Sequence, residues 1–128
     1  MKNNTMVLYD RYPLIINPTL AEMVGLNEAV VLQQIHYWTE KNRQDDRNLQ
    51  DGFYWTYNSI DAWHQEQFRF WGLNTLKRTF SSLESKELLI VGNYNKDPRD
   101  RTKWYRINHE KLEKYTLTDK LPKKLKLL

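Results

Sequence analysis

The stretch that decides the fold reads WTYNSIDAWHQEQ at residues 55–67, LNTLKRTFSSLES at 73–85, LLIVGNY at 88–94 and TKWY at 102–105. In its second segment, Leu76, Phe80 and Leu83 recur at helical spacing and predict an amphipathic helix. Aromatic and β-branched residues are typical of strands. Strands are therefore predicted over residues 53–57, 88–94 and 102–107, with a basic turn between the last two.

A short helix is expected between the first strand and the amphipathic helix. Asn58, with an acid three residues later, resembles a capping box and predicts the N-cap of this helix. Ile60 and Trp63 supply its apolar face, and the pattern ends near Gln67. Residues 68–72 then form a turn, so the two helices make a helix-turn-helix.

The N-terminal part of the chain contains two apolar segments. Leu14-Ile15-Ile16 lies between two prolines, which predicts an edge strand or an extended arm. Asn27 is the predicted N-cap of a first amphipathic helix that runs to about Asn42. The polar residues 41–52 are expected to form a loop.

Together with a last helix, capped by Asn108 and running through Tyr115, these elements predict an α+β winged helix-turn-helix. Its expected parts are a three-helix core, a β-hairpin wing, an extra N-terminal strand or arm, and a C-terminal helix. In this fold the second helix of the helix-turn-helix enters the DNA major groove, and the tip of the hairpin reaches phosphate. The predicted domains are a DNA-binding domain over residues 1–115 and a basic tail over 116–128.

Length and composition restrict the class of protein. A chain of 128 residues has room for one hydrophobic core. Aromatic residues make up 13% of the chain, which is too many for a disordered protein, and the absence of Cys excludes disulfides and thiolate metal sites. No segment approaches the ~18 apolar residues of a membrane span, and the N-terminus lacks a signal-length apolar run. We therefore expect a soluble cytoplasmic protein with no membrane partner.

The formal net charge of +4 is unevenly distributed. Residues 1–110 carry 14 Lys and Arg against 14 Asp and Glu, whereas residues 111–128 carry six Lys against two acids. The folded part is thus not basic as a whole, and the overall pI is weak support for DNA binding. Residues 67–83, by contrast, hold three basic residues and no acid, and residues 96–103 hold four basic residues against two acids. Both segments coincide with the predicted reading helix and wing.

Four segments in the correct order resemble the N-terminal winged-helix domain of replication initiators. They are LNEAVVLQQIHYW at residues 26–38, YWTY at 54–57, TLKRT at 75–79 and RTKWY at 101–105. The family comprises the replisome-organiser and DnaD-like proteins of phages and mobile elements in Gram-positive bacteria, and the resemblance covers roughly residues 7–115. It implies binding of origin DNA, self-association as a homodimer or higher homo-oligomer, and recruitment of helicase-loading proteins. The chain is shorter than the larger family members, so we expect either a fragment or a stand-alone DNA-binding module.

The candidate DNA-binding residues lie on the predicted reading helix, on the wing and at the helix-turn-helix. On the reading helix, Arg can pair with guanine and Asn with adenine, while Lys, Thr and Ser suit phosphates or base edges. The candidates there are Asn74, Thr75, Lys77, Arg78 and Ser81. On the wing, Lys96, Arg99, Arg101 and Lys103 can neutralise phosphates. At the helix-turn-helix, Asn58, Ser59 and Arg69 can contact the DNA backbone.

Each of these candidates has a structural alternative. The outer face of the reading helix can be an ordinary solvated surface, Asn58 can be only a cap, and Asp97 and Asp100 can pair with the wing arginines. Trp38, Trp55, Trp63 and Trp104 are expected in the core rather than as a stacking platform for single strands. Because the three histidines lie far apart in sequence and no Gly-rich phosphate loop is present, we expect neither an enzyme, a metal site nor a cofactor.

The expected function is therefore binding of double-stranded DNA in replication initiation. Two alternatives stay open at the level of sequence. One is a protein–protein interaction module of the same fold, which the near-neutral charge of residues 1–110 allows. The other is a transcriptional repressor of the same fold, which differs only in the DNA site that it occupies.

Overall fold

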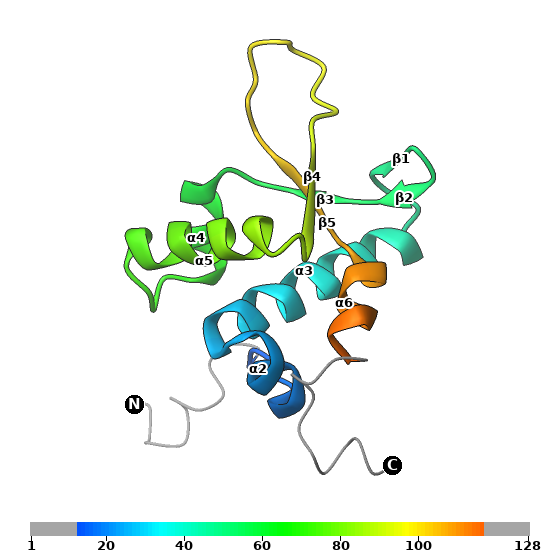
Figure 1. Ribbon diagram of the computed structural model, residues 1–128. Helices are drawn as coiled ribbons and strands as arrows, with labels where there is room; N and C mark the ends of the chain where they lie inside the picture. Colours follow the sequence, from blue (N-terminus) through cyan, green and yellow to red (C-terminus); the bar gives the residue numbers. More distant parts are fainter. Residues whose placement is uncertain (1–12, 117–128) are drawn as a thin grey trace, which may run out of the picture.

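The long helix α3 (Leu26–Gln44) organises an α+β fold, shown by a computed structural model that describes residues 13–116. It packs against α2 (Pro18–Val24) at its N-terminal end, against α5 (Leu73–Ser85), and against the central strand β5 (Trp104–Ile107). Figure 1 shows α4 and α5 to one side of the strands and the small β1–β2 hairpin to the other. α3 crosses beneath both.

The segment that precedes α3 differs from the predicted edge strand. Residues 13–17 form no strand, and the chain enters α2 at Pro18. The Asn17 side chain caps this helix by accepting hydrogen bonds from the backbone N–H groups of Thr19 (2.9 Å) and Leu20 (3.4 Å). Proline is favoured at the first helical position because its missing N–H has no partner there in any case. The proline that was expected to bound a strand therefore begins a helix.

Gly25, and not the predicted Asn27, is the N-cap of α3. Its φ of 106° lies in a region that L side chains rarely adopt, and a Cβ atom there would approach Glu28 Oε1 to 2.6 Å. The same glycine ends α2, so the two helices follow each other with a single residue between them. Glu28 lies in the first turn of α3, where the helix dipole favours an acid.

The predicted loop over residues 41–52 is wrong at both of its ends. α3 continues through Gln44, and β1 (Leu49–Gln50) pairs antiparallel with β2 (Phe53–Tyr54). The turn between them is Asp51–Gly52, with φ values of 53° and 81°. Positive φ at both central residues suits the twist of a two-residue hairpin.

The predicted strand over residues 53–57 is divided at Trp55. Its second part, β3 (Thr56–Tyr57), joins a three-stranded antiparallel sheet of order β3–β5–β4, in which β4 is Leu89–Gly92. Both strands of the predicted hairpin are present but shorter than expected. Tyr105 and Ile107 of β5 are buried, and the alternation of side chains directs Trp104 and Arg106 to the opposite face of the sheet. On that face the Arg106 guanidinium lies 3.6 Å from the centroid of the Phe53 ring.

Both helices of the predicted helix-turn-helix are present at their expected places. α4 is Ile60–Gln67, and α5 matches the predicted bounds of Leu73–Ser85. Ser59, rather than the predicted Asn58, caps α4, because its hydroxyl accepts a hydrogen bond from the Ala62 N–H at 3.1 Å. The last helix, α6 (His109–Thr116), is capped by Asn108 as expected.

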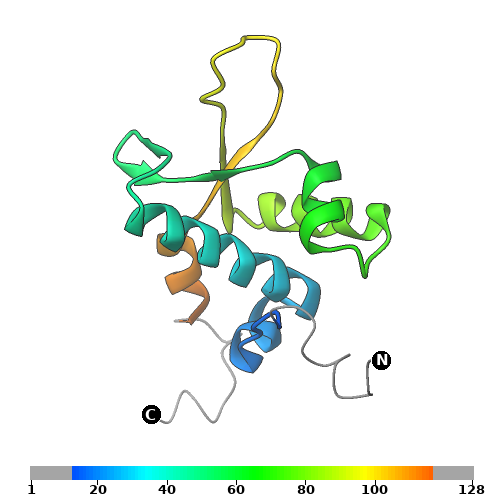
Figure 2. The ribbon, with the colours of Figure 1, turned by 180° about the vertical axis from the view of Figure 1, so that it is seen from behind.

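The core lies where α3, α4, α5 and the sheet meet. Trp63, Phe68, Phe80 and Tyr105 are among its largest buried side chains, and the rings of Phe80 and Tyr105 lie 5.0 Å apart. Trp55 and Trp104 are also buried, which confirms that these tryptophans serve packing. Seen from behind in Figure 2, the loop that joins β4 to β5 extends away from all of these helices. Among the described residues, no helix is long and apolar enough to cross a membrane.

Candidate nucleic-acid interface

The outer face of α5 carries four of its five predicted contact residues in exposed positions. Leu76, Thr79, Phe80 and Leu83 are buried, which turns the opposite side of the helix to solvent. The exposed residues are Asn74, Lys77, Arg78 and Ser81, while Thr75 is half-buried. The predicted orientation of this helix is therefore confirmed, with its cations outward and its apolar side inward.

Few intramolecular bonds restrain the polar groups of this face. Arg78 Nη2 donates to Thr75 Oγ1 at 3.3 Å, which is long for a hydrogen bond. The Thr79 hydroxyl is not available to a ligand, because it donates to the Thr75 carbonyl at 2.8 Å. Gly72 caps α5 without a side-chain hydrogen bond, and the first turn contains no acid. The N-terminal end of the helix thus keeps the positive potential that unsatisfied N–H groups provide.

An acid from α3 borders the cationic face, which the sequence alone did not indicate. Glu28 Oε2 accepts a hydrogen bond from Ser82 Oγ at 2.8 Å and lies 3.8 Å from Lys86 Nζ. Its side chain lines a hollow of about 300 Å³ together with Thr75 and Arg78. Glu28 and Ser82 are 54 positions apart in sequence, so no local pattern predicts their contact.

The loop of residues 93–103, called here the β4–β5 loop, contains all four predicted wing residues in exposed positions. Two of them are engaged by acids. Arg99 Nε lies 3.3 Å from Asp97 Oδ1, and Lys103 Nζ lies 3.0 Å from Glu84 Oε1 on α5. Within residues 13–116, Lys96 and Arg101 form no ion pair, so they are the cations that this loop offers most freely.

The two acids of the β4–β5 loop stay ionised. The backbone N–H of Arg99, and then its side chain, lower the pKa of the Asp97 carboxyl. The backbone N–H of Thr102 lowers the pKa of Asp100, whose Oδ1 accepts from it at 3.0 Å. The alternative in which both acids pair with arginines is therefore correct for Asp97 alone. Asp100 instead shapes the loop.

The remaining predicted contacts lie just before and just after α4, which packs against α5. Their side chains are not brought together into one cluster. Asn58 Nδ2 donates to Glu66 Oε2 at 3.2 Å, and the Ser59 hydroxyl serves as the helix cap. Arg69 is exposed in the turn before α5, beside the exposed ring of Phe70.

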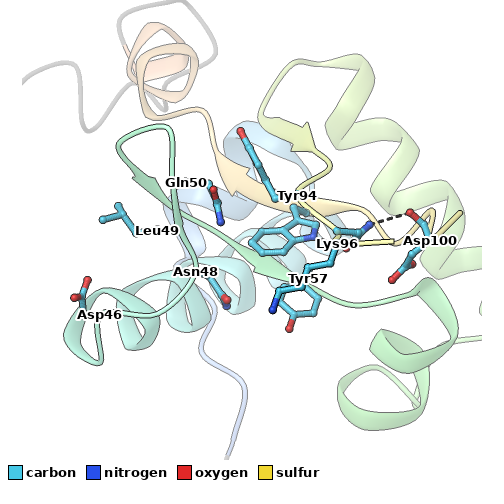
Figure 3. A pocket seen from close by; sticks show the side chains of 10 residues that line it. Asp46, Asn48, Leu49, Gln50, Tyr57, Tyr94, Lys96 and Asp100 are labelled. Atoms are coloured by element: carbon cyan, nitrogen blue, oxygen red, sulfur yellow. Dashed lines mark hydrogen bonds between the residues drawn. The ribbon is translucent and has the colours of Figure 1, made fainter. Parts of the chain in front are cut away.

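A second hollow, of about 640 Å³, was not predicted from the sequence. It lies between the β1–β2 hairpin and the base of the β4–β5 loop, and Figure 3 shows its aromatic and polar side chains. Tyr57 and Trp104 stack within it, with ring centroids 4.5 Å apart and an interplanar angle of 21°. The Asp-Gly turn could have indicated the hairpin. The alignment of residue 57 with residue 104 requires the register of the sheet.

The structure also brings together two histidines that are distant in sequence. The rings of His36 and His109 meet edge to face, with centroids 6.4 Å apart. Among residues 13–116, no three His, Cys, Asp or Glu side chains are grouped so that they could hold a metal ion.

Comparison of the chain with protein-family models, with curated proteins and with solved structures finds no match. The resemblance of the four sequence segments to replication initiators accordingly stays a prediction.

Proposed function

We propose that this chain is a winged helix that binds duplex DNA, with α5 in the major groove and the β4–β5 loop on the flanking backbone. The order α3, β3, α4, α5, β4, β5 and the antiparallel sheet order β3–β5–β4 support this fold. The two helices of the helix-turn-helix are then α4 and α5. In such a motif the second helix is the one that reads base edges.

The outer face of α5 is the observation that carries the proposal. Lys77 and Arg78 are exposed on it, no acid of α5 precedes Glu84, and the apolar side of the helix is sealed in the core. The major groove of B-DNA admits an α-helix, and a bidentate Arg–guanine pair contributes about 1–3 kcal/mol of base discrimination. We assign base reading to Asn74 and Arg78, and phosphate or base-edge contacts to Lys77, Thr75 and Ser81.

The β4–β5 loop adds affinity without sequence preference. Lys96 and Arg101, which lack ion pairs within residues 13–116, neutralise phosphates and release counterions. Arg99 and Lys103 contribute less, because binding must first weaken their pairs with Asp97 and Glu84. Arg69 reaches the backbone from the turn. Asn58 and Ser59 serve mainly to hold α4.

Within this proposal, the biological role is origin recognition in the replication of a phage or mobile element. Self-association and recruitment of a helicase loader are the further steps that the sequence resemblance implies. A pull-down with helicase-loading proteins tests this role. Retention of the loader supports the initiator, whereas DNA binding without retention favours a repressor of the same fold.

The experiment that tests DNA binding is a duplex titration by fluorescence anisotropy from about 50 to 200 mM salt. We expect affinity to fall steeply as salt rises. Arg78→Ala should cost roughly 1–3 kcal/mol of binding and relax preference at one base pair. Arg43→Ala, which removes an exposed arginine from the last turn of α3, is the matched control.

Two outcomes would count against the proposal. If Arg78→Ala binds every duplex as the parent does, α5 does not read the groove. If the parent binds no duplex even at about 50 mM salt, the interaction-module alternative is favoured.

A further inference from the structure

The hollow beside the β4–β5 loop contains a fixed aromatic platform. One face of the Tyr57 ring is covered by Trp104, yet Tyr57 is 46% exposed, so its other face is open. Trp104 is held in place by an edge-to-face contact with Tyr94 at 5.4 Å and by a 2.8 Å hydrogen bond from its indole N–H to Asn95 Oδ1. A planar ring can continue this stack without any rearrangement of the protein.

The rim of the hollow offers polar groups that complement the edge of a base. Asn48 and Gln50 both line it, and within residues 13–116 their side chains form no hydrogen bonds. Each side-chain amide has an NH2 group that donates hydrogen bonds and a carbonyl oxygen that accepts them. The edge of a nucleobase also combines donors and acceptors. The Asn95 amide differs, because it already bonds Trp104 and the carbonyls of Asp100 and Thr102. The unengaged amides are therefore the groups available to a ligand.

The charges in the hollow select a ligand with a limited negative charge. Lys96 supplies an ammonium without an ion pair among the described residues, which suits one phosphate and disfavours a cationic ligand. Asp46 and Asp100 line the same hollow and oppose a polyphosphate. Stacking must then supply most of the affinity, because opposed charges leave little net attraction for phosphate.

We propose that this hollow is a second nucleic-acid site, which binds an unpaired nucleobase stacked on Tyr57 with its phosphate near Lys96. The base comes either from single-stranded DNA or from a free nucleotide. The site does not require α5, but it shares Lys96 with the proposed phosphate contacts of the β4–β5 loop. Variants of Tyr57, and not of Lys96, therefore separate it from duplex binding.

Binding of a short fluorescent oligo-dA strand tests the site, because purines stack most strongly. We expect Tyr57→Phe to bind as the parent does and Tyr57→Leu, which keeps apolar bulk but loses the planar ring, to bind about tenfold more weakly. Tyr37→Leu is the matched control, since Tyr37 is a similarly exposed tyrosine on α3 and lies outside the hollow. Circular dichroism and urea midpoints establish that each variant is folded.

Duplex binding separates this proposal from the first. Tyr57→Leu should bind duplex as the parent does, and Arg78→Ala should bind oligo-dA as the parent does. Binding of oligo-dA should also fall less steeply with salt than duplex binding. Competition by free AMP at equal base concentration identifies a nucleotide as the ligand, whereas failure of AMP to compete identifies a strand.

The proposal is overturned if the parent binds neither oligo-dA nor AMP, or if Tyr57→Leu binds them as tightly as the parent. If the Tyr57→Leu variant is unfolded, Gln50→Ala provides the test instead, because it alters only the rim of the hollow. Gln50→Ala must then weaken oligo-dA binding at least twofold, or the site is rejected.

Discussion

Lys103 at the base of the β4–β5 loop forms an ion pair with Glu84 near the end of α5, with 3.0 Å between Nζ and Oε1. The pair joins the two surfaces that we propose to contact duplex DNA. It engages one of the cations that would otherwise be available to phosphate. The acid comes from α5, the proposed reading helix, so the interaction both restrains the loop and reduces its positive field.

Replacing Glu84 should therefore strengthen duplex binding. Glu84→Gln frees Lys103 and removes a negative charge from the end of α5, so we expect affinity to rise about threefold at low salt. The slope of log K against log salt should steepen by about 0.9, which corresponds to one additional phosphate contact. Glu22→Gln, at an exposed position on α2, makes the same change in net charge and serves as the control. Equal effects of the two variants would show that only net charge matters.

The two arginines of the β4–β5 loop should differ in their effect on affinity. Arg101 has no ion pair within residues 13–116, whereas Arg99 lies against Asp97. We expect Arg101→Ala to weaken binding to all duplex sequences alike and to reduce the salt slope by about 0.9. Arg99→Ala should have a smaller effect, because Arg99 is already paired with Asp97 and contacts phosphate less freely than Arg101. A larger loss for Arg99→Ala than for Arg101→Ala would contradict the assignment of free cations. Anisotropy titrations at three salt concentrations measure both slopes.

Gly92 should be required for the aromatic packing behind the proposed single-strand site. A Cβ atom at this position would come within 2.9 Å of Tyr94 Cε2 and 3.0 Å of Trp55 Cη2. Because Trp55 is buried, the neighbours cannot move freely, and we expect Gly92→Ala to lower the free energy of unfolding by about 1–3 kcal/mol. Urea denaturation measures this loss. Gly72→Ala is the comparison and should lose less, since a Cβ atom there meets nothing within 4 Å and only the capping of α5 is weakened. If both variants were equally stable, the close packing around Gly92 would be disproved.

Alkaline pH should destabilise the fold through Tyr105. Burial, and secondarily the charge of Glu84, raise the pKa of its phenol above the ordinary value of 10.0. The folded state therefore favours the neutral phenol. The contribution of Tyr105 to the free energy of unfolding is complete below about pH 10 and is lost as pH rises further. While only the unfolded chain ionises, the free energy of unfolding falls by about 1.4 kcal/mol for each pH unit.

Tyr105→Phe should remove this part of the pH dependence, because the ring still packs on Phe80 but carries no ionisable group. Urea midpoints measured between pH 9 and 11 on the parent and the variant give the comparison. Tyr37→Phe controls for the loss of an exposed phenol. Parallel curves for the parent and Tyr105→Phe would refute the role of burial.

Some elements that differ from expectation carried local signals in the sequence. Asn17 followed by Pro18 is a helix start, since the amide caps the first turn and proline fits the first helical position. Asp51–Gly52 before the aromatic residues Phe53 and Tyr54 is a hairpin turn. The flanking prolines are a competing signal for an extended segment at residues 13–18, and the polar composition of residues 41–52 is a competing signal for a loop.

The sequence by itself determined α5. Its buried face follows from the spacing of Leu76, Phe80 and Leu83, because an amphipathic helix needs only its own periodicity and a core to pack against, and its bounds match the predicted residues 73–85. The exposure of Lys77 and Arg78 follows from the same period.

The tertiary structure alone decided which charges are free and which rings meet. Lys103 meets Glu84 across 19 positions, and Ser82 meets Glu28 across 54. Tyr57 faces Trp104 only because β3 pairs with β5 in one register. A one-residue slip would turn that ring to the other side of the sheet. Long-range pairing depends on how separate elements pack, and no local pattern of residues specifies it.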